Sequence, residues 1–552
     1  MLRLTGFALA LALATACGNG SPAEVEDKNA PVLSITEPTR GTTVTGDFVT
    51  VTGSIADEEL GAGSVTINGV PAEVGDDGQF TAQVPLAHGV TILETIATDA
   101  AGNQASDHRG VLAGQHAPLD TTVRDALVAE LTPATFAVLG DVSAGALTSV
   151  DFEAVGERIS PIVDRGNSCF GVEVDLRDVQ FSELNVVLVP TEGSVNITVA
   201  ASDLDVDMRA NWEISCFGGG AGLNISADEL VIDGTLAVEL VSGRFVATLE
   251  NATARFEGFD LDVGSIPDSI VNFFVDDIDQ KVAGALVGAI RDVVPGVVQS
   301  TLDDFSDKQI ETTLFGITMN LSFVATSVAI DENGGRVALD FAAGSPDVAD
   351  ATYIATPQIA PSSAVMGSQS FGVALADDVA NQMLAILWHA GALDAELDVG
   401  GTPLRDIFPS ATRVTIDLLL PPVITTTADS ELAAIGIGDL LVTARADDGA
   451  AIAELALSGH VEVGVSTALE GNASFSATIA DLSTSVLSGD DAIGLTSEQL
   501  AVFAEVGVAQ VRSQIDDVLQ QLTIPKFGAE VRTPSLGATR GYLLVSGQLT
   551  VE

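Results

Sequence analysis

Residues 266–305 carry apolar side chains at helical spacing. The row recurs at every fourth position and consists of Ile270, Phe274, Ile278, Val282, Leu286, Ile290 and Val294. An i+4 row drifts by about 40° per step on a 3.6-residue helix, so this row winds around the helix axis. The stretch therefore predicts a long helix that is apolar over much of its circumference. Two interpretations fit it: a buried core helix, or a core helix that also lines a lipid cavity.

A second helical stretch spans residues 496–522. Thr496 and Gln499 form a capping box at its start. The apolar stripe that follows includes Phe503, Val511, Ile515 and Leu519. The two helical stretches begin about 230 residues apart, and each follows several segments that alternate apolar and polar residues. This order predicts a pseudo-repeat of two similar halves.

Most of the remaining chain alternates with a period of two, which is typical of strands with one buried face. Shorter helices are expected at residues 121–131 and 377–389. Apolar residues make up 47% of the chain and aromatic residues only 5%, and 54 glycines accompany them, a composition that favours strands and turns. We therefore expect a mainly β fold with two long helices, of the α+β class.

Residues 31–110 contain short strand-like segments at intervals of 8–12 residues, which predict a β-sandwich. The segments PVLSITEPTRGTTVTGD, VTINGVPAEVGDDGQFTAQVPL and ATDAAGNQAS resemble bacterial Ig-like domains. The resemblance implies a spacer or an adhesive module whose protein partner is unknown. Asp99 and Asn103 fit either a turn or a calcium site, and turn chemistry explains them more simply.

The N-terminal residues 1–16 have one cation followed by an apolar run, as in a secretory signal peptide. The sequence LATAC ending at Cys17 resembles a bacterial lipobox, in which Cys17 is lipidated and anchors the protein in a membrane. The alternative is an ordinary signal peptide cleaved near Ala16. Residues 17–30 are predicted to be a flexible tether, and we expect the cell envelope, at the outer membrane, as the location.

Cys169 and Cys216 flank two strand-like segments that are joined by a turn at residues 190–193. Folding this hairpin places residue 169 opposite residue 215, within one residue of Cys216. Because an exported protein meets an oxidising compartment, we predict a Cys169–Cys216 disulfide.

The formal net charge of −55 excludes nucleic acid as a partner, because such a chain repels phosphates. The five His residues show no zinc-ligand spacing, and the chain has no G-x-S-x-G motif of the serine hydrolases. Carboxylates are so frequent that no pair among them indicates a glycosidase. We therefore expect a protein that is not an enzyme and that holds no metal.

The order of elements and three segments resemble the bactericidal/permeability-increasing protein family of tubular lipid-binding proteins. The segments are FGVALADDVANQMLAILWHAGAL, PLRDIFPSATRVTIDLLLPPVI and GLTSEQLAVFAEVGVAQVRSQIDDVLQQLTIPKF. The resemblance implies a boomerang of two barrels, at 119–350 and 365–552, each a curled antiparallel sheet around a long helix. Two features depart from the family: both cysteines precede the first long helix, and the basic tip that binds lipopolysaccharide has no counterpart.

These observations favour a lipid-binding or lipid-transfer protein with no cofactor, in which phospholipid or fatty acid is the ligand. The residues expected to line the lipid grooves are Ile270, Phe274, Ile278, Val282, Leu286, Ile290, Phe503, Val511, Ile515 and Leu519. The alternative is a surface structural or adhesion protein that acts through its Ig-like segment.

Overall fold

The structure is a computed structural model that describes residues 28–57, 63–151, 154, 160–167, 169–303, 306–357, 359–400, 405, 408–426, 433–467, 473–488 and 530–550. Strands account for 61% of it and helices for 13%. The predicted class, a mainly β fold with two long helices and a barrel curled around each, is wrong, because the described residues do not contain two long helices. Among the described residues, α4 (Ile278–Leu302) is the longest helix, with 25 residues. The second predicted long helix, 496–522, lies outside the described residues.

The chain divides into two compact units. The smaller comprises Met1–Pro38, Thr50–Val84 and Glu94–Asp107, and the larger comprises Thr39–Val49, Pro85–Leu93 and His108–Glu552. The domain boundaries expected from the sequence remain predictions.

Short strands between residues 32 and 113 form a four-stranded sheet, β1-β3-β7-β6, and a five-stranded sheet, β2-β9-β8-β4-β5. Their bounds are β1 Val32–Glu37, β2 Thr42–Val44, β3 Phe48–Ala56, β4 Ser64–Ile67, β5 Val70–Pro71, β6 Glu73–Val74, β7 Gln79–Pro85, β8 Gly89–Thr98 and β9 Gln104–Ala113. In the smaller unit, alternate residues such as Val51, Ile55, Val65, Ile67 and Phe80 are buried, as the period of two predicts.

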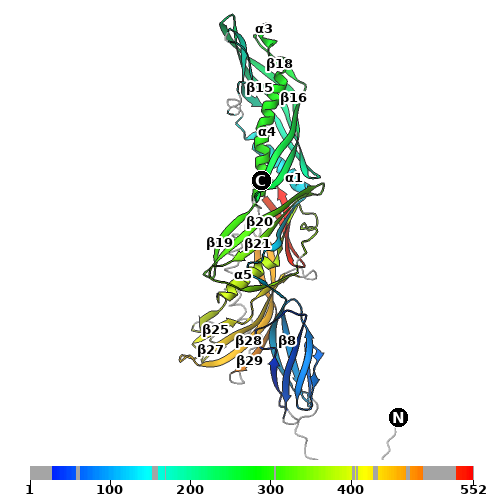
Figure 1. Ribbon diagram of the computed structural model, residues 1–552, viewed down its shortest axis with the longest axis vertical. Helices are drawn as coiled ribbons and strands as arrows, with labels where there is room; N and C mark the ends of the chain where they lie inside the picture. The colour runs from blue at the N-terminus through cyan, green and yellow to red at the C-terminus, as the bar shows by residue number, and fades with distance from the viewer. Residues whose placement is uncertain are drawn as a thin grey trace, which may run out of the picture. The chain divides into compact units, whose positions relative to one another are not determined.

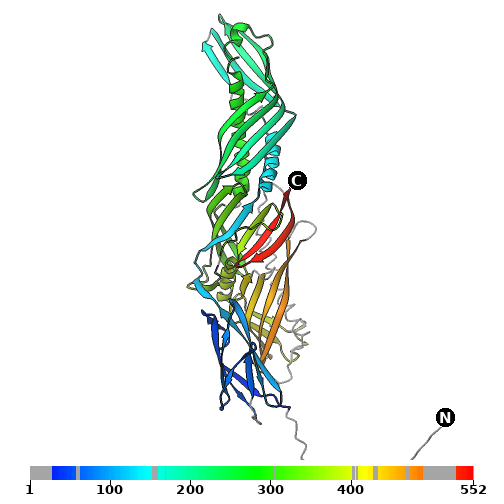
Figure 2. The same cartoon turned by 90° about the vertical axis from the view of Figure 1, so that its right-hand side faces the viewer.

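The larger unit contains a seven-stranded curled sheet that carries α4 on its inner face (Figures 1 and 2). Its strands are β12 Val163–Asn167, β13 Phe170–Gln180, β14 Glu183–Thr191, β15 Ser194–Ile214, β16 Phe217–Val241, β17 Arg244–Glu257 and β18 Asp260–Asp262. At about 3.3 Å per residue, the 25 residues of β16 extend over roughly 80 Å. This length explains why strands dominate the fold.

The helix expected at 266–305 is interrupted, which corrects the prediction of one continuous rod. A four-residue helix, α3 (Asp268–Val271), is followed by turns, and α4 begins only at Ile278. The interruption contains Asn272, Asp276 and Asp277, which have low helix propensity and bond well to backbone groups in turns. These residues therefore favour the turns that separate α3 from α4.

A second seven-stranded sheet has the order β19-β20-β21-β11-β23-β31-β30. Its bounds are β11 Val123–Leu131, β19 Lys308–Leu314, β20 Ile317–Asp331, β21 Gly334–Gly344, β23 Phe371–Ala376, β30 Glu530–Thr539 and β31 Tyr542–Thr550. The helix expected at 121–131 is instead strand β11, so that prediction is wrong. Asp125, at φ 48°, interrupts the register between Val123 and Leu127. This bulge breaks the alternation that identifies a strand in a sequence.

Two further helices and a third sheet complete the larger unit. They are α1 (Pro133–Thr148), α5 (Asp377–His389), β24 Ala395–Asp398, β25 Arg413–Leu418, β26 Val423–Thr426, β27 Ala433–Arg445, β28 Ala451–Thr467 and β29 Ala473–Ser488, and a pair formed by β10 Gln115–Pro118 and β22 Thr352–Ala355. The helix predicted at 377–389 has the bounds of α5. Helix α1 contacts β14 closely, because a Cβ on Gly140 would lie 2.4 Å from the carbonyl oxygen of Val186.

Candidate functional site

A seam of apolar side chains, called the α4 seam below, lies between α4 and the inner face of the curled sheet. The helix contributes a buried row that consists of Ile278, Val282, Leu286, Ile290, Val294, Val298 and Leu302. Strands β13 to β16 contribute alternate residues that point toward this row. On the opposite side of the helix, Gly284 and Gly296 are exposed. The helix therefore packs through one face, which is wider than the narrow stripe of a surface helix.

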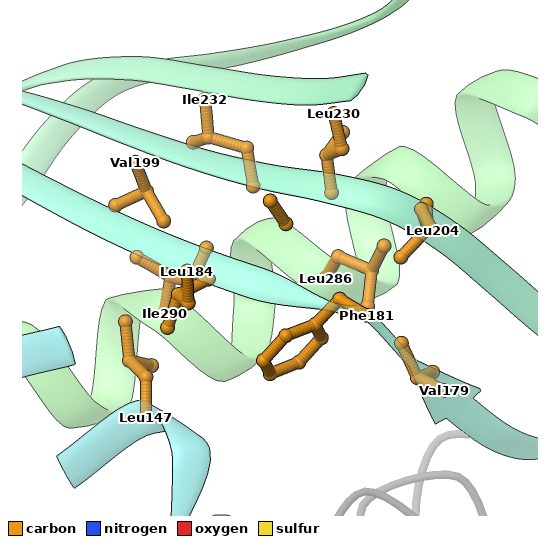
Figure 3. Close-up of a pocket in the computed structure, with 11 residues that line it drawn as sticks. Leu147, Val179, Phe181, Leu184, Val199, Leu204, Leu230, Ile232, Leu286 and Ile290 are labelled. Atoms are coloured by element: carbon orange, nitrogen blue, oxygen red, sulfur yellow. The ribbon is translucent and has the colours of Figure 1, made fainter. Parts of the chain in front are cut away.

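The α4 seam contains a small cavity of about 30 Å³ (Figure 3). The lining side chains come from α1, α4 and the region of β13 to β16: Leu147, Val179, Phe181, Leu184, Val199, Ala201, Leu204, Leu230, Ile232, Leu286 and Ile290. Every one of them is a hydrocarbon side chain. In Figure 3, Leu286 and Ile290 point from α4 toward Val199, Leu230 and Ile232 on the sheet.

This lining determines what the cavity can bind. No lining side chain offers a hydrogen bond or a charge, so a polar ligand would lose its bonds to water without replacement. An apolar ligand has no hydrogen bonds to water to lose, and its burial is favourable by about 25 cal/mol per Å² of buried apolar area. The cavity therefore suits hydrocarbon, and it has no group that could act in acid–base or nucleophilic chemistry.

A second, smaller cavity of about 20 Å³ lies farther along the same helix. It is lined by Leu131, Phe136, Leu139, Val238, Val298, Leu302, Val328, Ile330, Gly335, Arg336 and Val337. Helix α4 lines both cavities: Leu286 and Ile290 line the first, and Val298 and Leu302 line the second.

The residues expected to line lipid grooves have different positions in the structure. Leu286 and Ile290 line the larger cavity. Ile270, Phe274, Ile278 and Val282 are fully buried in the same core, beyond that cavity. Phe503, Val511, Ile515 and Leu519 lie outside the described residues, and their assignment remains a prediction.

Most of the cavity lining comes from strands, and sequence reasoning did not select these residues. Val199, Ala201 and Leu204 belong to β15, and Leu230 and Ile232 belong to β16. The alternation of apolar and polar residues predicts that their side chains face inward, but it predicts the same for every other buried strand residue. Only the register between β15 and β16 brings these particular residues together.

Cys169 and Cys216 form a disulfide in the structure, with their Cα atoms 4.0 Å apart. The bond joins the start of β13 to the turn between β15 and β16, where Cys216 N–H also donates to the carbonyl oxygen of Cys169 at 3.2 Å. The lipidation site expected at Cys17 lies outside the described residues and stays a prediction.

Among the described residues, no group of three or more His, Cys, Asp or Glu is placed to hold a metal ion. By length and composition, residues Ile278–Ser300 of α4 would suffice to cross a membrane, a test that a buried core helix also passes. In the structure, one face of α4 is buried against the sheet.

A family model described as glucodextranase, domain B, matches residues 31–115, which overlap the Ig-like segment expected from the sequence. No curated relative matches the chain. Among solved structures, a lipopolysaccharide binding protein is 12% identical, with 78% of this chain and 100% of that chain covered and a TM-score of 0.43. P47 from Clostridium botulinum A2 is 9% identical, with 77% and 97% covered and a TM-score of 0.23.

Proposed function

We propose that the protein binds lipid and holds acyl chains in the α4 seam. The observation that carries this proposal is the cavity of about 30 Å³, whose eleven lining residues are all apolar. Native cores are packed to the density of organic crystals, so a cavity along a long apolar helix identifies the place where hydrocarbon is added most easily.

Binding requires α4 to move away from the sheet, because sites for small molecules usually measure about 300–1,000 Å³. Helix α4 contains Gly284, Gly288, Pro295 and Gly296. Each Gly disfavours a helix by about 1 kcal/mol and Pro by about 3 kcal/mol, so packing rather than intrinsic propensity holds α4 in place. An acyl chain that enters the seam replaces one apolar contact by another.

We propose that the protein is anchored in the outer membrane through a lipidated Cys17, and that it stores or transfers lipid without catalysing a reaction.

A cavity-filling substitution tests the site. Ala201 is buried on the inner face of β15 and lines the cavity. Leu at this position is expected to occupy the cavity and to lower the amount of bound lipid about tenfold, since overpacking a core costs about 1–3 kcal/mol. Native mass spectrometry and lipid extraction of the full chain purified from cells measure the bound lipid.

The matched control is Ala200→Leu, because Ala200 is the next residue of the same strand and points to the other face. It should retain the lipid of the unaltered chain. Unaltered protein that carries no fatty acid or phospholipid contradicts the proposal, and so does Ala201→Leu protein with an undiminished lipid content.

A second candidate function is adhesion through residues 31–115, which match a family model described as glucodextranase, domain B. Val32 and Phe48 are 68% and 60% exposed in this segment. Loss of cell-surface binding on Phe48→Ser, with lipid content unchanged, would favour adhesion over lipid binding.

A further inference from the structure

One end of the curled sheet exposes aromatic side chains to solvent. Phe217 follows the turn between β15 and β16 and is 81% exposed, and Phe170 at the start of β13 is 38% exposed. Phe273, from the turn after α3, lies against Phe170 with 5.3 Å between the ring centroids. Together with Trp212 and Ile214 these residues are called the aromatic tip below. Figure 1 shows α3 beside this end of β15 and β16.

The aromatic tip is continuous with the apolar inner face of the sheet. In the strand register, Phe170 lies opposite Ile214, and Ile214 lies opposite Phe217. Residues opposite each other in a sheet point to the same face. Two residues farther along each strand, Val172 and Trp212 form the next pair on that face, and Val172 is buried. The exposed aromatic residues are therefore the solvent-facing end of the core that contains α4.

The backbone around the tip leaves room for these aromatic rings. β16 begins with a run of small residues, Gly218, Gly219, Gly220, Ala221 and Gly222. A Cβ on Gly219 would lie 2.7 Å from Trp212 Nε1, so the indole of Trp212 lies directly over this glycine. The glycine run thus provides a flat surface, against which a single large aromatic side chain packs.

Covalent and polar contacts hold the tip in place. The Cys169–Cys216 disulfide joins its two strand ends. Arg165 Nη1 donates to the carbonyl oxygen of Phe273 at 2.9 Å, and the same guanidinium forms an ion pair with Asp277. A fixed tip loses little conformational freedom when it binds, which favours binding.

The charge pattern at the tip is unusual for this chain. Residues 214–227 and 166–172 contain no charged side chain, although the whole chain has 77 acidic and 22 basic residues. Acidic groups begin at the edge of the tip, at Glu173, Glu213 and Asp276, and all three are exposed. Arg165, whose side chain is 49% exposed, adds a positive charge beside Phe273 and pairs with Asp277. The aromatic rings of the tip are therefore bordered mainly by negative charge, with Glu213 between Trp212 and Ile214.

We propose that the aromatic tip inserts into an uncharged or zwitterionic lipid surface. This inference rests on the proposed function and identifies the part of the protein that contacts the lipid surface. Aromatic and aliphatic side chains at such a surface are buried by about 5–10 Å at the boundary of headgroups and acyl chains. Glu213, one position from the turn on the outer face, limits insertion to the shallow end of that range. The bordering carboxylates repel anionic headgroups.

Trp212 provides a built-in reporter of insertion, because the chain contains only two tryptophans. In a Trp388→Phe background, all tryptophan fluorescence comes from Trp212. The full chain is mixed with vesicles of phosphatidylcholine that is brominated on its acyl chains, and bound protein is measured by sedimentation. We expect quenching of Trp212 and binding that is weaker when phosphatidylglycerol replaces phosphatidylcholine.

Phe217→Ser, made in the Trp388→Phe background, tests the contact itself. Removing one Phe side chain that is buried in the bilayer on binding is expected to weaken vesicle binding about tenfold or more. The matched control is Ile359→Ser, because Ile359 is 82% exposed, as Phe217 is, and belongs to another segment. The control should bind vesicles as the parent does. Equal binding by the Phe217→Ser variant, absence of quenching, or tighter binding to phosphatidylglycerol would each overturn the proposal.

Lipid content measured on the same samples separates this inference from the proposed function. Phe217→Ser protein should lose vesicle binding, and Ala201→Leu protein should lose its co-purified lipid while its tip still binds vesicles. If no form of the protein contains lipid but Trp212 is quenched, the α4 seam proposal fails and the aromatic tip stands. If lipid co-purifies but Trp212 is not quenched, the tip proposal fails alone.

Discussion

Asp439→Ala is expected to lower the free energy of unfolding of the larger compact unit by about 3–5 kcal/mol, the usual effect of breaking a buried ion pair from one side. The side chain of Asp439 is fully buried, and its Oδ1 lies 2.8 Å from Arg40 Nη1. Its carboxylate also accepts hydrogen bonds from Gly41 N–H at 3.0 Å and from Gly110 N–H at 3.1 Å. Alanine would remove the acceptor of the buried Gly110 N–H and of the partly buried Gly41 N–H, and Arg40 would keep its hydrogen bond to the carbonyl oxygen of His108 at 2.7 Å.

The backbone at Asp439 adds to this effect. Its φ is 48°, a left-handed conformation that Asp and Asn adopt more readily than Ala. Asp439→Asn keeps this conformation and one acceptor oxygen but removes the charge. It should therefore lower the free energy of unfolding by less than Asp439→Ala does.

Urea-induced unfolding measures both variants against Asp417→Ala, an exposed position in β25 that should change stability by less than about 0.5 kcal/mol. A loss below about 1 kcal/mol for Asp439→Ala would contradict the expected result.

The bulges of the sheets explain which parts of the fold the sequence could predict. Alternation identified the long strands, because residues two apart share a face over many positions. Asp125 and Asp439 have positive φ at breaks in register. Asp203 also has positive φ and is left out of the β15–β16 pairing, although the register on either side of it is the same. In β15, buried residues are odd-numbered up to Ala201 and even-numbered from Leu204. Nothing in the local sequence distinguishes these aspartates from the many others.

The helices show the same limit for a different reason. Periodicity correctly placed α5, where one amphipathic face is buried. It also placed residues 266–305 in a helix, but it could not show that this helix is interrupted between Val271 and Ile278. Similarly, the inner-face residues of β15 and β16 were visible as apolar positions, whereas the cavity depends on small gaps between side chains from α1, α4 and four strands. Such gaps follow from three-dimensional packing and have no local signal.

Long-range polar contacts were equally inaccessible. Arg40 and Asp439 are separated by 399 positions, and in a chain with 77 acidic residues the partner of any one cation is undetermined by sequence. The buried polar residues of α5 are another example. Asp377, Asp378, Asn381 and Gln382 are all buried, although an amphipathic helix would expose them. They bond to strands that the sequence alone does not bring together.

The polar start of α5 is the basis of the second large effect. Asp378 Oδ1 accepts a hydrogen bond from Thr356 N–H at 2.9 Å, and Asn381 exchanges two hydrogen bonds with the backbone of Ile424. The pKa of Asp378 is raised from 3.8 to about 7, chiefly by burial; the neighbouring carboxyl of Asp377 also raises it, and the hydrogen bond from Thr356 N–H lowers it. Tyr353 and Tyr542 face the same carboxyls, and burial raises the pKa of each to about 12.

The sign of the pH dependence follows from this raised pKa. Between pH 4 and 7 the folded protein keeps a proton on Asp378 that the unfolded chain releases, so stability falls as the pH rises through this range. The loss approaches about 4 kcal/mol at pH 7 and above, which corresponds to the difference between the two pKa values. Asp378→Asn cannot ionise and should therefore be more stable than the unaltered chain at pH 8 and similar to it at pH 4.

Denaturant unfolding from pH 4 to 8 tests this prediction as a difference between the two proteins, because the many other carboxylates contribute equally to both. Asp120→Asn, at an exposed position, is the matched control and should follow the profile of the unaltered chain. An Asp378→Asn protein whose profile runs parallel to that of the unaltered chain would contradict the assignment. Since α5 bonds to β21, to Thr356 after β22 and to β26, a charge on Asp378 weakens the junction of three sheets of the larger unit.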